Sequence, residues 1–94
     1  MIEYRLLVDL EAVVELDSLP KRDRSRLLLF FEKLRAYPED HCAAEERDDR
    51  GRRISIATHG GWLIHYWTDF ADRHVKILKV LRVTGGSRPK GIRK

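Results

Sequence analysis

The segment between Pro20 and Pro38 constrains the fold more than any other part of this chain. Its large apolar residues recur at steps of one to three, which gathers them on one side of an α-helix and leaves the basic residues largely outside that side. Proline cannot continue the interior of a helix, so the helix is predicted to run from Pro20 to Tyr37. Its apolar side must be buried against another layer. That side comprises Leu27, Leu28, Phe30, Phe31, Leu34 and Tyr37.

A strand and a second, shorter helix are predicted before this segment. Ile2, Tyr4, Leu6 and Val8 alternate with Glu3, Arg5 and Leu7, which is the period of a half-buried strand. Asp9 has the place of an N-cap for a short helix with an apolar stripe, and Pro20 stops that helix. The N-terminal part is therefore predicted to be strand, helix, helix.

Three strands are predicted after the long helix. Residues 39–51 contain almost no large apolar side chain and are expected to form an exposed connection with solvated acidic groups. Residues 53–58 and 62–68 follow as strands joined by Gly60-Gly61, a two-residue hairpin signal because both glycines tolerate positive φ. The last strand, 75–83, is nearly continuous in apolar character, which indicates a central place in the sheet.

These elements predict one α+β domain of order β-α-α-β-β-β, with two N-terminal helices packed on a small antiparallel sheet. A chain of 94 residues buries roughly two-thirds of its unfolded surface, so a helix layer on one sheet is about the largest architecture it can stabilise. Two parts are expected: the folded domain at 1–83 and a basic, flexible tail at 84–94.

The net charge of the chain belongs to that tail. Residues 84–94 hold four of the 19 basic residues and none of the 15 acidic ones, so residues 1–83 balance at 15 and 15 and the tail holds the whole +4. A basic tail attracts polyanions without sequence preference. The alternative is an ordinary solvated terminus.

Composition also excludes several classes of protein. The single cysteine, Cys42, excludes an internal disulfide and a multi-cysteine zinc site. His41 and His74 have no partner at metal-binding spacing, and no cofactor is expected. With no long apolar run and no signal-peptide pattern, the chain is predicted to be a soluble cytoplasmic protein that does not enter a membrane.

The order of elements and several residues resemble the RelE/ParE superfamily of toxins. The matching features are the first strand with Asp9, the Leu19-Pro20 stop, the helix from Arg24 to Leu34 followed by Tyr37-Pro38, and the closing strand. Gly61-Trp62-Leu63-Ile64-His65-Tyr66 is similar to the family's glycine–aromatic–arginine–aliphatic–x–tyrosine strand. The resemblance spans nearly all of residues 1–83.

This resemblance implies a toxin of a bacterial type II toxin–antitoxin system, of the kind that stabilises plasmids, neutralised by a cognate antitoxin. The RelE-like branch cleaves mRNA in the ribosome as an mRNA interferase, and the ParE-like branch inhibits DNA gyrase. The two branches share the fold, so the fold cannot choose between them. Leu63 stands where the nuclease branch has an arginine, which favours inhibition of DNA gyrase as the function.

RNA cleavage without metal requires a base for the 2′-hydroxyl, positive charge near the phosphorane and a proton for the leaving oxygen. If Ile54 and Ile56 face the helices, Arg53 and His59 lie on the open face of the sheet, where His65 also has to act. Lys79 and Arg82 alternate to opposite faces, so only one can join the site. The predicted catalytic residues are His65, His59 and Arg82, and the predicted RNA-binding residues are Arg53, Trp67 and Arg52.

Each of these residues also has an ordinary structural explanation. His65 and His59 can be hydrogen-bonded sheet or turn residues, the arginines can be surface charges, and Trp67 can belong to the core. The expected function is that of a ribosome-dependent mRNA endoribonuclease. Two alternatives stay open: a gyrase inhibitor that breaks no bond, and a toxin-fold protein that has lost toxicity and only binds a partner.

Overall fold

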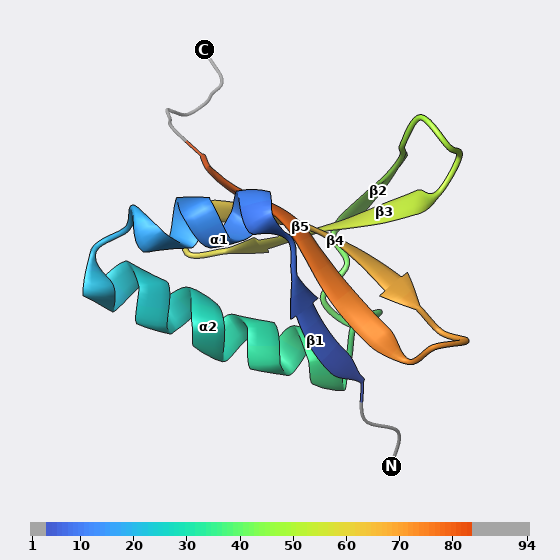
Figure 1. Cartoon of the computed structure of the whole chain (residues 1–94), viewed down its shortest axis with the longest axis horizontal. Helices are drawn as coiled ribbons and strands as arrows, with labels where there is room; N and C mark the ends of the chain where they lie inside the picture. The colour runs from blue at the N-terminus through green and yellow to red at the C-terminus, as the bar shows by residue number, and fades with distance from the viewer. Residues whose placement is uncertain (1–3, 84–94) are drawn as a thin grey trace.

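Two helices and a five-stranded sheet make up the part of the chain that the structure describes (Figure 1). The computed structural model describes residues 4–83, and the tail predicted at 84–94 lies outside these residues. The helices are α1 (Leu10–Asp17) and α2 (Lys21–Ala36). The strands, in chain order, are β1 (Arg5–Val8), β2 (Ala44–Arg47), β3 (Arg53–His59), β4 (Trp62–Asp69) and β5 (His74–Arg82). The α+β class is confirmed, with one strand more than predicted.

The sheet has the order β1-β5-β4-β3-β2, and β5 is central between β1 and β4, as its apolar character predicted. The neighbouring pairs from β2 to β5 are antiparallel. β1 and β5 are parallel, so the sheet is mixed and the prediction of a purely antiparallel sheet was wrong. Parallel strands cannot be joined by a tight turn. The β1–β5 pair joins segments that lie far apart in the chain, so local sequence patterns do not predict it.

Local signals account for the helix ends. The Asp9 side chain accepts a hydrogen bond from the Leu10 amide at 3.1 Å, so Asp9 caps α1 as predicted. α2 begins directly after Pro20 and ends at Ala36, one residue earlier than predicted, with Pro38 following in the turn. No helix in residues 4–83 is long and apolar enough to cross a membrane.

β2 is the strand that sequence patterns missed. It lies within the acidic segment that was expected to be only an exposed connection, and it pairs with β3 along the edge of the sheet. All four of its residues are exposed, so neither of its faces carries the apolar alternation by which strands are recognised. An exposed edge strand tolerates this polarity, since none of its side chains is buried.

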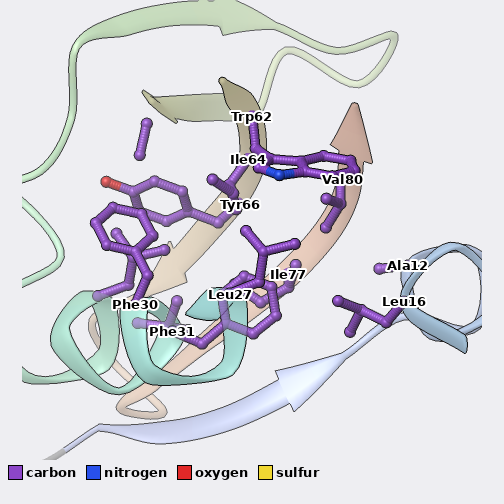
Figure 2. Packing of buried hydrophobic residues seen from close by; sticks show 13 residues of the cluster. Ala12, Leu16, Leu27, Phe30, Phe31, Trp62, Ile64, Tyr66, Ile77 and Val80 are labelled. Carbon is purple, nitrogen blue, oxygen red and sulfur yellow. The ribbon is translucent and has the colours of Figure 1, made fainter. Parts of the chain in front are cut away.

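The core lies between the helices and one face of the sheet (Figure 2). Leu27 and Phe31 of α2 are buried with Ile64 and Tyr66 of β4 and Ile77 of β5, and Ala12 and Leu16 of α1 complete the same cluster. The buried Tyr66 hydroxyl donates a hydrogen bond to the Pro38 carbonyl at 2.5 Å, which ties the turn after α2 to the centre of the sheet. Burial, with the nearby Cys42 and Glu39, raises the pKa of the Tyr66 phenol well above its ordinary value.

The face assignment of β3 corrects the sequence prediction. Ala57 is fully buried in the core cluster, opposite Ile64, whereas Ile56 pairs with His65 on the other face. Ile54 and Ile56 therefore point away from the helices. The Gly60-Gly61 turn, with φ of 55° and 86°, places His59 opposite Trp62 and so fixes this register. Hydrophobicity alone predicts that the isoleucines, rather than Ala57, face the helices.

We expect Tyr66→Phe to lower the free energy of unfolding by about 1–3 kcal/mol, because the buried Pro38 carbonyl loses its donor. Urea unfolding followed by circular dichroism measures this. Tyr37→Phe is the matched control, since Tyr37 is exposed, and its unfolding midpoint should stay unchanged.

The raised pKa of the Tyr66 phenol adds a pH test. Tyr66 stabilises the fold fully below about pH 10, the ordinary tyrosine value, and less as pH rises above it. Tyr66→Phe should therefore lose less stability than the parent between pH 9 and 11, and equal alkaline losses would contradict the burial argument.

Candidate nucleic-acid interface

The structure divides the predicted site residues between the two faces of the sheet. His65 and Trp67 lie on the open face of β4, the face away from the helices, and Ile56 and Lys76 are their cross-strand partners. His59 lies on the helix-covered face, stacked on Phe30 of α2 with ring centroids 4.3 Å apart. The prediction that His59 and Arg53 share the open face with His65 was wrong, because the turn register places them on the opposite face.

Arg82 and Arg53 also lie on the helix-covered side. Arg82 is opposite Trp62, and its guanidinium carbon lies 4.9 Å from the centre of a Trp62 ring. Arg53 lies opposite Arg47 and forms an ion pair of 3.5 Å with Glu45. These side chains are separated by the sheet itself from His65. A single catalytic group containing His65, His59 and Arg82 is therefore not assembled.

A pocket of about 160 Å³ is hollowed into the open face around His65. It combines two acidic, two basic and two aliphatic side chains with the imidazole, drawn from β2, the β2–β3 turn, β3, β4 and β5. Its lining residues are Glu46, Asp48, Arg52, Ile54, His65, Leu78 and Lys79.

Glu46 is the nearest charged partner of His65. Its Oε1 lies 3.5 Å from the imidazole Nδ1, and the His65 side chain is only 14% exposed. Sequence reasoning treated Glu46 as a solvated charge. Its place in the pocket follows from β2, whose register puts Glu46 opposite Ile54 on the open face. The acidic segment gave no signal strong enough to predict that pairing.

A β-bulge brings two lysines onto the open face. The register shifts between His65 and Tyr66, so that His65 pairs with Lys79 while Tyr66 pairs with Ile77. In a strand with strict alternation, Lys76 and Lys79, three residues apart, would lie on opposite faces. The bulge breaks this alternation, and Lys76 and Lys79 both lie on the His65 side. Within the described residues neither lysine has an acidic partner within ion-pair distance.

Asp48 positions Arg52 over Trp67. The carboxylate accepts hydrogen bonds from the Arg52 Nε at 2.6 Å and from the backbone amides of Arg50 and Arg52. The guanidinium carbon of Arg52 lies 5.0 Å from a Trp67 ring centre. Partial desolvation raises the pKa of Asp48, but the hydrogen bonds outweigh it and hold the pKa below its ordinary value. Because Arg52 covers Trp67, a base would stack on the guanidinium plane rather than on the indole.

One group of possible metal ligands lies at the far end of β4 and β5. Asp69, Asp72 and His74 place ligand atoms within 4.8 Å of one another, although sequence spacing offered His74 no such partner. The Asp72 carboxylate already contacts His74 Nδ1 and the Arg5 guanidinium, each at 3.1 Å. These contacts give the group a structural role in closing the turn.

The open-face pocket holds the residue types that phosphodiester chemistry needs. Histidine and glutamate can accept and donate protons, and lysine and arginine can stabilise charge on a phosphate. On the helix-covered face a second pocket is lined by Asp23, His59 and Trp62, and Arg82 lies over the Trp62 ring. Its histidine, His59, is stacked flat on Phe30. The open face is thus the better candidate for chemistry on a nucleic acid.

Comparison with solved structures assigns the fold. A chain of the toxin–antitoxin complex RelBE2 from Mycobacterium tuberculosis superposes with a TM-score of 0.75 at 23% identity, covering 86% of this chain and 99% of that one. A chain of the RelE–RelB complex from Pyrococcus horikoshii gives 0.69 at 27%, covering 87% and 96%. The isolated RelE toxin of E. coli gives 0.70 at 15%, covering 94% and 88%. No family model and no curated protein matches the chain.

The chain is therefore a RelE-fold protein. The likeness to the isolated E. coli toxin shows that the shared fold is that of the toxin subunit. The resemblance to the RelE/ParE superfamily, predicted from the order of elements and the spacing of residues, is confirmed at the level of fold.

We expect the Arg52–Trp67 contact to depend on pH through Asp48. Since the Asp48 pKa is lowered on folding, its contribution is present above about pH 4, the ordinary aspartate value, and is lost as pH falls further. The Trp67 indole signal in NMR spectra should shift on acidification from pH 6, and Asp48→Asn should show the shifted position already at pH 6. Asp49→Asn, an exposed neighbour, is the control. Identical titrations of the parent and Asp48→Asn would contradict this role of Asp48.

Proposed function

We propose that this chain is the toxin of a type II toxin–antitoxin pair and that it cleaves mRNA on the ribosome at the open-face pocket. The RelE fold supports the toxin assignment. The observation that carries the activity is the convergence of Glu46, His65 and Lys79 in one pocket on the uncovered side of the sheet. An RNA strand can reach that side because both helices of residues 4–83 lie on the other face of the sheet (Figure 1).

In the proposed reaction the 2′-oxygen attacks the adjacent phosphorus, and the bond from phosphorus to the 5′-oxygen breaks. Glu46 accepts the 2′-hydroxyl proton, and a protonated His65 donates a proton to the leaving 5′-oxygen. Lys79, directly opposite His65, stabilises the negative charge of the phosphorane. Lys76 and Arg52 hold the flanking backbone and bases. The products are a 2′,3′-cyclic phosphate and a free 5′-hydroxyl, and no metal is needed.

Leu63 supports a second candidate function. It stands where the nuclease branch has an arginine, and it pairs on the open face with Leu81, which is 43% exposed. That end of the open face is apolar, and an apolar patch suits a protein partner better than a phosphate. A gyrase inhibitor of the ParE kind, which breaks no bond, is the alternative.

Inducible expression tests the proposed activity. The parent chain should arrest growth with cleaved mRNA, and His65→Asn or Lys79→Met should lower the cleavage rate by about a hundredfold and relieve the arrest. His59→Asn and Arg82→Met, on the other face, should leave cleavage unchanged. Lys33→Met, an exposed lysine on α2, controls for loss of charge.

Three outcomes would contradict the proposed function or its site. Arrest with intact mRNA and altered DNA supercoiling would favour gyrase inhibition. Loss of cleavage in His59→Asn and Arg82→Met, with His65→Asn active, would move the chemistry to the helix-covered face. Benign expression of the parent, with tight binding to the neighbouring gene's product, would identify a toxin-fold protein that only binds a partner.

We also propose an antitoxin partner, and the outer side of α2 offers it a surface. A groove of about 580 Å³ is lined by Leu6, Leu28 and Leu29 together with Ser25 and Glu32. Leu29 is 68% exposed and Leu28 is 45% exposed, so two large apolar side chains are left uncovered on the surface of α2. The similar chain from M. tuberculosis comes from a toxin–antitoxin complex, and the one from P. horikoshii comes from a RelE–RelB complex.

Leu29→Lys should weaken binding to the cognate antitoxin by about tenfold or more, because it places a charge in the apolar groove. Co-purification with the neighbouring gene's product, followed by calorimetry, measures the affinity. Leu10→Lys is the matched control, since Leu10 is 73% exposed on α1 outside the groove. Equal affinities of the two variants would move the antitoxin surface elsewhere.

A further inference from the structure

Three aromatic side chains from distant segments surround a pocket beneath the end of α2. Tyr4 precedes β1, Tyr37 follows α2, and Phe70 lies in the turn between β4 and β5. Tyr4 and Phe70 meet edge to face with centroids 6.2 Å apart, while Tyr37 and Phe70 are 54% and 51% exposed. The pocket, of about 310 Å³, lies apart from both the open-face pocket and the groove beside Leu29.

Negative charge borders the same pocket. Glu39 and Asp40 belong to its lining, and neither forms an ion pair within the part of the chain that the structure describes. The carboxyl end of α2 lies at Ala36 in the pocket wall, and the end of a helix carries partial negative charge on its last carbonyl groups. Aromatic faces, carboxylates and a helix C-terminus all favour a cation.

The pocket walls are held in place by contacts that leave its interior free. The Tyr66 hydroxyl fixes the Pro38 carbonyl, and the Asp40 amide donates to the Tyr37 carbonyl at 3.2 Å. Arg35, the nearest basic residue along α2, donates to the Tyr4 carbonyl and pairs with Glu32 at 3.0 Å, so its charge is already engaged. The recognition surface is therefore formed before a ligand arrives.

We infer that this aromatic–acidic pocket binds the arginine side chain of a basic segment in a protein partner. A planar guanidinium can stack on an aromatic ring and donate two parallel hydrogen bonds to a carboxylate, whereas an ammonium group is a compact point charge. Charge complementarity selects this occupant over an apolar side chain. The inference is independent of the proposed function, because the pocket uses none of the residues assigned to RNA cleavage.

Two short peptides test the inference on the full-length chain by NMR titration. Acetyl-Ala-Arg-Ala-amide should shift the backbone signals of Tyr37, Asp40 and Phe70. Acetyl-Ala-citrulline-Ala-amide, which keeps the shape of arginine without its charge, should bind about five- to tenfold more weakly. Equal binding of the two peptides, or shifts located elsewhere, would overturn the inference.

Matched variants separate the two sources of attraction. Phe70→Leu keeps an apolar side chain without a ring, and the double variant Glu39→Gln with Asp40→Asn removes both charges. Each should weaken the arginine peptide by about threefold or more, with unchanged circular dichroism. The double variant Glu11→Gln with Asp49→Asn removes two exposed carboxylates elsewhere and should bind as the parent does. An effect of this control as large as that of Glu39→Gln with Asp40→Asn would show nonspecific attraction and refute the pocket.

Discussion

The register that Gly60 and Gly61 impose on the β3–β4 hairpin decides what each side of this molecule can do. With His59 opposite Trp62, every second residue of both strands is directed to the helices. Ala57, Ile64 and Tyr66 thereby enter the core, and His65 is left on the open face. A shift of one residue would exchange the faces. The two positive-φ glycines are thus as important to the site as any of its charged residues.

The open-face pocket then depends on two departures from regular pairing. The bulge opposite His65 turns Lys76 and Lys79 to the same side, and the edge strand β2 adds Glu46. Both features lie where the ladder is least regular, which is where bulges commonly redirect side chains near functional sites. The same bulge turns Ile77 and Val80, which are also three residues apart, toward the core. The proposed chemistry and the core therefore depend on the same irregularity, one on each face of the sheet.

Much of the fold could be predicted from the sequence because its signals are local. The prolines around α2, the Asp9 cap and the glycine pair each act within a few residues, and all three predictions are confirmed. The parallel β1–β5 pair and the edge strand β2 depend on contacts across the chain, and they were missed. Strand alternation puts His65 and Trp67, two residues apart, on one face, and the structure has them so, but their catalytic and binding roles stay predictions. Alternation failed to assign the faces of β3, because Ile54 is buried, at 4% exposure, on the face away from the helices.

The absence of an arginine at Leu63 changes what a nuclease site here would have to do. Charge stabilisation would rest on Lys79 and Lys76, which are point charges on flexible stems rather than planar forks. Proton transfer would then rest on His65 and Glu46, which lie close enough to act together. Arg52, held by Asp48 over Trp67, has little freedom to move toward a phosphate. The open-face pocket therefore favours acid–base chemistry aided by lysine over catalysis centred on arginine.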